Sequence, residues 1–93
     1  MIKYSFLEDK NTMVITTKSI LNKVKDIILV SHDEDDGMWE FLDGEEINEE
    51  DAAIVSLFEI VKLDDSVNEL CELPLVWGAY RDNKNKKWVR QIN

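Results

Sequence analysis

Apolar residues fall in short runs along this chain, and polar or acidic residues separate the runs. Residues 13–16 and 27–32 are rich in β-branched side chains and predict two strands. Thr17 predicts an N-cap for a short helix over residues 18–24, in which apolar side chains recur at helical spacing. Residues 3–7 fit either a short strand or a frayed arm.

An acidic loop that contains a glycine follows the second strand and predicts a β-hairpin. Residues 33–37 form this loop, and residues 38–42 form the returning strand. Trp39 and Phe41 share one face of that strand, and we expect this face to be buried. Residues 43–44 then end the strand in a turn.

The most regular apolar pattern in the chain predicts a helix that ends near residue 62. Asn48 is a favourable N-cap residue, and the acidic first turn suits the positive end of the helix dipole. The apolar stripe of this helix consists of Ile54, Leu57, Phe58 and Val61. Asp64 or Asp65 then caps a second short helix, which Pro74 ends.

A second hairpin is predicted at the end of the chain. Residues 75–81 and 87–91 are strand-like, and residues 82–86 have the composition of a turn. Strict alternation of strands and helices is absent, which argues against a parallel α/β fold. We therefore expect residues 1–93 to form a single α+β domain with two layers: a mainly antiparallel sheet and two or three short helices packed on one face. Residues 1–10 would add a strand or a frayed arm.

Composition and charge argue against several classes of binding partner and cellular location for this chain. The 93 residues are 44% hydrophobic, which suffices for one modest core, since a chain of this size hides roughly two thirds of its surface on folding. Eleven Lys and Arg against twenty Asp and Glu give a net charge of −9, which disfavours nucleic acid and anionic membranes as partners. No apolar run approaches the ~18 residues of a membrane helix and no signal-peptide pattern is present, so we expect a cytoplasmic protein.

The most distinctive feature is an acidic belt over residues 33–51, which holds eleven carboxylates and no Lys or Arg. The belt has three interpretations: a solvated surface, a docking face for a basic partner, and a cation site. On the docking interpretation, Trp39 would be an aromatic anchor if its ring were partly exposed. The candidate partner-binding residues are Asp33, Glu34, Asp35, Asp36, Trp39, Glu45, Glu46, Glu49 and Glu50.

The cation interpretation has one concrete form, at the tip of the first hairpin. Its ligands would be His32, Asp33, Asp35 and Asp36. An EF-hand register that uses Gly37 as its glycine starts on an imidazole and ends on Asp43 instead of Glu, so the match to a calcium loop is weak. One histidine is too few for the common zinc signatures, and a histidine at a hairpin edge that merely titrates is the simpler interpretation.

No catalytic signature is visible, and we expect no enzymatic activity. Cys71 is the only cysteine, and its spacing with Val67 and Leu70 predicts a place in the core. Four strand aromatics also fit a core better than a ligand platform: Trp39, Trp77, Tyr80 and Trp88. A basic end has the composition of an ordinary hairpin turn, able to pair with the acidic belt. It comprises Arg81, Lys84, Lys86, Lys87 and Arg90.

Several short motifs occur in a characteristic order in the second half of the chain. Residues 36–46 contain Asp, Gly, Trp, an aromatic residue, a second Gly and an acid, and four further motifs follow, at residues 54–57, 63–67, 73–74 and 78–82. This order resembles a bacterial family of uncharacterised domains classed among the immunity proteins of polymorphic toxin systems, immunity family thirty-three. The resemblance covers residues 30–89. Met38 departs from it, because the family has Gly directly before Trp.

The resemblance implies a small non-enzymatic protein that protects its producer by binding a co-encoded toxin. It carries over no catalytic residue and no cofactor. Our hypothesis is therefore an immunity-type protein that neutralises a toxin, basic by the logic of charge, through its acidic surface. The alternative is a small accessory domain that binds a ligand or a divalent metal ion. The sequence leaves the oligomeric state open.

Overall fold

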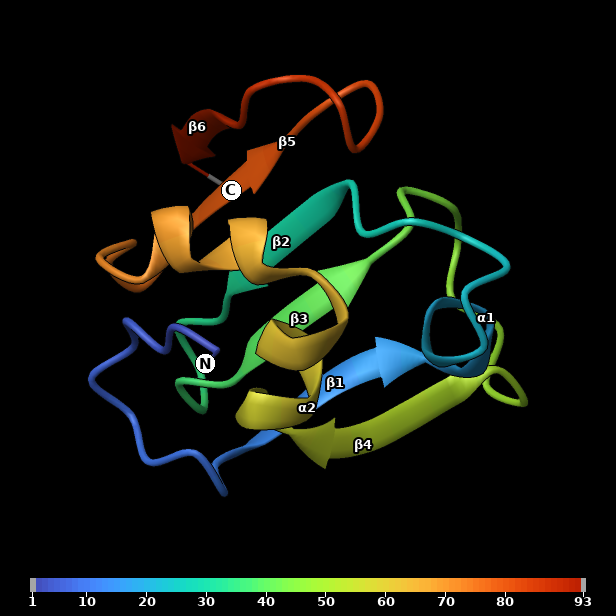
Figure 1. The fold of residues 1–93 in the computed structure, drawn as a ribbon, viewed down its shortest axis with the longest axis horizontal. Coiled ribbons are helices and arrows are strands. Elements are labelled where there is room, and N and C mark those ends of the chain that lie inside the picture. The colour runs from blue at the N-terminus through green and yellow to red at the C-terminus, as the bar shows by residue number, and fades with distance from the viewer. Residues whose placement is uncertain (1, 93) are drawn as a thin grey trace.

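Six short strands form one mixed sheet in the computed structural model, which describes residues 2–92 (Figure 1). The strands are β1 Met13–Thr17, β2 Leu29–His32, β3 Trp39–Leu42, β4 Ala52–Ser56, β5 Trp77–Tyr80 and β6 Val89–Ile92. Their order across the sheet is β4-β1-β3-β2-β5-β6, and only the β1–β3 pair is parallel. The helices are α1 Lys18–Leu21, α2 Leu57–Leu63 and the 3₁₀ helix η1 Asp65–Leu70. The predicted α+β fold with a mainly antiparallel sheet is confirmed.

The helices α2 and η1 lie over one face of the sheet, in front of the strands in Figure 1. The core fills the space between these two layers. The sheet contributes Val14, Val30, Trp39, Phe41 and Ala79 to it, and the helices contribute Leu57, Ile60, Val61, Val67 and Leu70. Alternation along the strands sends the intervening side chains to the opposite face. Among residues 2–92, no helix is long and apolar enough to cross a membrane.

Residues 2–12 of the described chain form no strand, yet this N-terminal arm is docked on the core. Phe6 is buried, and its ring meets the Trp39 ring edge-on with centroids 5.2 Å apart. The Ser5 amide donates a hydrogen bond to Asn68 Oδ1 (2.9 Å), and Asn68 Nδ2 donates to the Lys3 carbonyl (3.1 Å). The arm therefore covers the core next to Trp39, at the start of β3.

The helix predicted to begin after Asn48 is wrong in its first half. The chain makes a turn at residues 48–51, pairs as β4 with the edge of β1, and becomes helical only at Leu57. Ser56 is the real N-cap, because its hydroxyl accepts a hydrogen bond from the Glu59 amide (3.3 Å). Pairing with β1 satisfies backbone groups that a helix would have left at an open sheet edge. The apparent stripe is split, since Ile54 is 64% exposed.

The predictions that rest on local capping residues and turns agree with the structure better than the predicted helix after Asn48 does. Thr17 caps α1 as expected, with its hydroxyl accepting from the Ile20 amide (3.2 Å), although α1 ends at Leu21. Asp64 caps the next short helix, which is η1. Both predicted hairpins form, β2 with β3 and β5 with β6.

Candidate functional site

The fold divides the acidic belt between the two ends of β3. The tip cluster, Asp33, Glu34, Asp35 and Asp36, lies in the turn between β2 and β3. The loop cluster, Glu45, Glu46, Glu49 and Glu50, lies between β3 and β4. A four-residue strand is about 13 Å long, so the clusters are separate patches and not one continuous belt.

Each cluster borders an open hollow. The tip cluster, with His32 and Val76, lines a hollow of about 380 Å³. The loop cluster contributes Glu45, Glu46 and Glu50 to a hollow of about 540 Å³, which Lys25 also lines. Lys25 forms ion pairs with Asp43 (3.8 Å) and Glu45. The loop cluster is thus partly neutralised, whereas the described residues that line the hollow at the tip include no Lys or Arg.

Trp39 is not available as an anchor for a partner. Only 1% of it is exposed, because Phe6 and His32 cover its ring. The His32 ring stacks on it with centroids 4.0 Å apart, and its indole nitrogen donates a hydrogen bond to Glu8 Oε2 (2.8 Å). Trp39 therefore belongs to the core, and the partner-binding role predicted for it is corrected.

The geometry does not support the alternative of a metal site at the hairpin tip. The Nδ1 atom of His32 lies 2.8 Å from the Leu73 carbonyl oxygen, and its ring is held by the stack on Trp39. In residues 2–92, no three His, Cys, Asp or Glu side chains come together in a way that could hold a metal ion. The proposed ligands His32, Asp33, Asp35 and Asp36 therefore do not form a coordination site.

Glu40 gives the tip an acid–acid pair that the sequence did not single out. It lies on β3, next to Ile15 of β1 and Ser31 of β2, on the sheet face opposite the helices. A hydrogen bond with the Asp33 side chain, then partial burial and the charges of Asp33 and Asp36, raise the pKa of Glu40 to about 7. Near pH 7, the Glu40 carboxyl group is thus protonated for part of the time, and in that form it can donate a hydrogen bond to Asp33.

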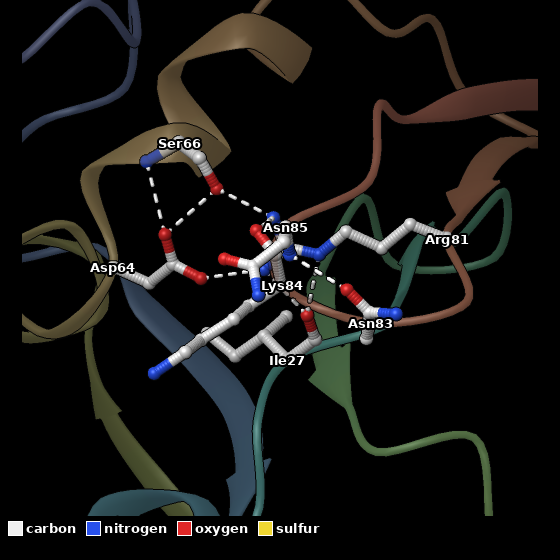
Figure 2. A network of polar contacts seen from close by, with 7 residues as sticks. All are labelled: Ile27, Asp64, Ser66, Arg81, Asn83, Lys84 and Asn85. Atoms are coloured by element: carbon white, nitrogen blue, oxygen red, sulfur yellow. Dashed lines mark hydrogen bonds and ion pairs between the residues drawn. The ribbon is translucent and has the colours of Figure 1, made fainter.

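The sequence groups Arg81 with the basic residues of the final hairpin turn, and the structure corrects this, because Arg81 is buried. Its side chain is only 2% exposed, and Figure 2 shows it reaching three segments of the chain. Nε and Nη2 donate to the Ile27 carbonyl (3.0 and 2.7 Å), and Nη2 also donates to Asp64 Oδ2 (2.6 Å). Nη1 donates to Ser66 Oγ (2.9 Å) and to the Lys84 carbonyl (3.4 Å). All five guanidinium donors are thereby used, so Arg81 holds the fold together and leaves none for a ligand.

The other residues of the predicted basic end are spread over the final hairpin. Trp88 is buried and lies under the Arg81 guanidinium, 4.0 Å from ring centroid to Cζ. Arg90 is tied to η1 and its following turn through the Glu69 carbonyl (2.6 Å) and Glu72 Oε1 (2.8 Å). Lys84, Lys86 and Lys87 lie at the tip, as expected of a hairpin turn.

Cys71 packs against the core but is only half-buried. Burial raises the pKa of its thiol, and the Glu72 carboxylate, 3.6 Å from Sγ, raises it further. Because only the thiolate is a strong nucleophile, this environment does not activate Cys71.

A third hollow, of about 660 Å³, lies between α1, the end of α2 and the final hairpin. Its lining includes Lys3, Lys23, Lys25, Lys62 and Lys84, together with Asp26, Asp64 and Asp65. Lys25 and Lys62 are already ion-paired with nearby acids. These lysines are far apart in the sequence, so no local sequence pattern predicts that they line one hollow. Because the hollow is lined by both Lys and Asp side chains, its charge favours no particular class of ligand.

Comparisons of the chain with protein-family models, with curated proteins and with solved structures found no match.

Proposed function

We propose that this chain is a non-enzymatic, immunity-type protein that neutralises a co-encoded bacterial toxin by binding it through acidic surface groups. The observation that carries the proposal is uncompensated negative charge. Of the eleven carboxylates between Asp33 and Asp51, only Asp43 and Glu45 form an ion pair with a cation of residues 2–92. The resemblance to immunity family thirty-three supports the same function.

Uncompensated negative charge lowers the stability of a small domain, but it also favours binding to a basic partner. Like charges on one small domain repel one another and lower its stability, so a dense acidic surface is most easily understood if a partner neutralises it. A negative surface also attracts a basic partner over distances of about 10 Å at 0.1 M salt and speeds encounter. A toxin that acts on phosphate-containing substrates would have the matching basic surface.

The proposal is tested with the product of the gene adjacent to the one that encodes this chain. Co-expression should yield a complex that survives size-exclusion chromatography at low salt, and expression of this chain should restore growth of cells that produce the toxin. Raising the salt concentration should reduce the association rate strongly and the dissociation rate little. The absence of both a complex at micromolar concentration and growth rescue would overturn the proposal.

A variant separates the contribution of charge from that of the scaffold. Replacing Glu34 and Asp35 by Gln and Asn removes two exposed, unpaired charges of the tip cluster without touching the core. The association rate should fall, whereas the same change at Glu59 and Asp65, on the helical side, should leave it nearly unaltered. Equal effects of the two pairs would show that only net charge matters.

A further inference from the structure

The strand β4 lies at one edge of the sheet and is paired on one side only. Its partner in the described chain is β1, in antiparallel register, with Ile54 opposite Ile15. Figure 1 shows β4 along the lower edge of the sheet, with no helix or strand beyond it. An edge of this kind presents backbone donors and acceptors with which a further strand can pair.

The hydrogen bonds to β1 show which backbone groups of β4 point outward. At one end of β4 the Asp51 carbonyl accepts a hydrogen bond from the first amide of α1 (2.7 Å), and at the other end the Leu57 amide donates one to the residue before β1 (2.8 Å). Bonded residues alternate along an antiparallel pair, so every second residue between these two points its amide and carbonyl away from β1. The outward-pointing residues are Ala52, Ile54 and Ser56.

Two of the outward-pointing groups already have a partner within the chain. The Ala52 amide donates to the Asn48 carbonyl (3.1 Å). The Ser56 carbonyl accepts the first hydrogen bond of α2, as the carbonyl of an N-cap residue does. In the described part of the chain, the groups that remain for a further strand are the Ala52 carbonyl, the amide and carbonyl of Ile54, and the Ser56 amide.

These remaining groups are complementary to the same groups of a second copy. When two β4 strands lie antiparallel with Ile54 opposite Ile54, each Ile54 amide meets the Ile54 carbonyl of the other strand. Each Ser56 amide then meets the Ala52 carbonyl of the other copy. The pair left over, the Ala52 amide and the Ser56 carbonyl, consists of the two groups that are already bonded within each chain. Sliding either strand by two residues would satisfy fewer of the remaining groups.

The side chains of β4 do not prevent such pairing. Edge strands that stay single in native proteins usually carry a Lys, a Pro or a bulge, and residues 52–56 contain none of these. Ile54 is 64% exposed, and in the antiparallel pair its side chain would lie next to Ile54 of the other copy. The opposite edge of the sheet, β6, carries Arg90 within the strand and lacks this feature.

Charge at the two ends of β4 is also complementary in an antiparallel pair. Glu49 and Glu50 precede the strand, and neither is ion-paired within residues 2–92. At the other end Lys10 lies over the Phe58 ring, with Nζ 4.8 Å from the centroid, and it too has no carboxylate partner there. Antiparallel pairing brings the acidic end of each copy to the Lys10 end of the other.

We propose that two copies of this chain associate through β4, paired antiparallel about a two-fold axis at Ile54, so that their sheets join into one. The inference goes beyond the proposed function, and its outcome leaves that function untouched. The net charge of −9 on each copy opposes association, but at 0.1 M salt such repulsion is screened beyond about 10 Å. A five-residue strand makes a contact well below the roughly 800 Å² per partner of a stable interface, so we expect a dimer that forms only at high micromolar concentration.

Sedimentation equilibrium of the full chain, from low micromolar to millimolar concentration, measures the association. The average mass should rise from the monomer value of 10.9 kDa towards twice that value. Ile54→Lys sets two ammonium groups against each other, and Ile54→Pro removes the outward amide without removing a bond to β1. The matched control is Ile92→Lys, on β6 at the opposite edge, where the side chain is also 64% exposed. Each Ile54 variant should raise the dissociation constant at least tenfold, whereas the control should stay within about twofold of the wild type.

Amide hydrogen exchange of the wild type tests the same contact without a substitution. The Ile54 amide should exchange severalfold more slowly at millimolar than at low micromolar concentration, because pairing protects it. The Val55 amide points towards β1, so its exchange should be slow at both concentrations. Equal exchange of the Ile54 amide at both concentrations would show that this edge does not pair.

Three results would overturn the proposal. The first is a wild type that remains monomeric at millimolar concentration. The second is a dimer that Ile92→Lys dissociates and Ile54→Lys does not, which would place the contact at β6. The third is growth beyond a dimer, as expected if β4 of one copy pairs head-to-tail with β6 of the next. Should Ile54→Pro fail to fold, Ile54→Lys and the exchange of the Ile54 amide decide the matter.

Discussion

Glu40 allows the electrostatics of the acidic hairpin tip to be measured without a partner. The substitution Glu40→Gln keeps the size of the side chain and removes its titration. In the folded protein, the hydrogen bond with Asp33, partial burial and the charges of Asp33 and Asp36 raise the pKa of Glu40 from 4.5 to about 7. Folding therefore favours the protonated form of this carboxyl group.

The direction of the effect on stability follows from this pKa. Between about pH 4.5 and about pH 7, the folded state holds the Glu40 proton more tightly than the unfolded state does. The stability that Glu40 contributes is complete below this range and is lost as the pH rises through it. At about 1.36 kcal/mol per pKa unit the full effect is on the order of 3 kcal/mol, and because water reaches much of this side chain we discount the effect to about 1 kcal/mol.

Glu40→Gln should therefore differ little from the wild type near pH 5 and be more stable by about 1 kcal/mol near pH 8, a rise in Tm of about 4–8 °C for a domain of this size. Urea unfolding followed by tryptophan fluorescence, at several pH values across this range, measures the difference. Glu34→Gln, at an exposed position of the same hairpin tip, is the control and should show no such dependence on pH. A constant difference between Glu40→Gln and wild type at all pH values would refute the reasoning.

Three further predictions concern the scaffold. Arg81→Lys should lower the free energy of unfolding by about 3 kcal/mol in urea titrations, because one ammonium group cannot serve the five bonds of the guanidinium, and Arg90→Lys should cost under 1 kcal/mol. Phe6→Ala should cost about 3 kcal/mol and shift the tryptophan emission to the red, whereas Leu7→Ala, at a side chain that is 98% exposed, should change neither quantity. The Cys71 thiol should react with a disulfide reagent more slowly in the folded protein than in urea near pH 8, since its folded-state pKa is raised; equal rates would contradict the described burial.

Features that depend on neighbours in the sequence were predictable. Thr17 and Asp64 cap their helices because a side-chain oxygen bonds an amide two or three residues away, which needs no distant partner. Both hairpins also follow from local turn chemistry and from alternation, which placed Trp39 and Phe41 in the core.

Features that depend on distant partners were not predictable. Residues 52–56 lie in the first half of the predicted helix, and they form β4 because β1, some forty residues earlier, provides an edge to pair with. The sequence alone places Arg81 in a basic hairpin. In the structure its guanidinium group is hydrogen-bonded to Ile27, Asp64 and Ser66. Its burial is an outcome of three segments meeting, and no single segment encodes it.

The sequence by itself determined the acidic character of this protein, its α+β composition, the caps of α1 and η1 and the two hairpins, because charge, capping and alternation are local properties. Only the tertiary structure decided that the acidic residues would lie in two groups at the ends of β3, and that Glu40 would stand between them on a face without helices. The physical reason is that sheet order and register join residues far apart in the chain, and those pairings set which side chains share a surface.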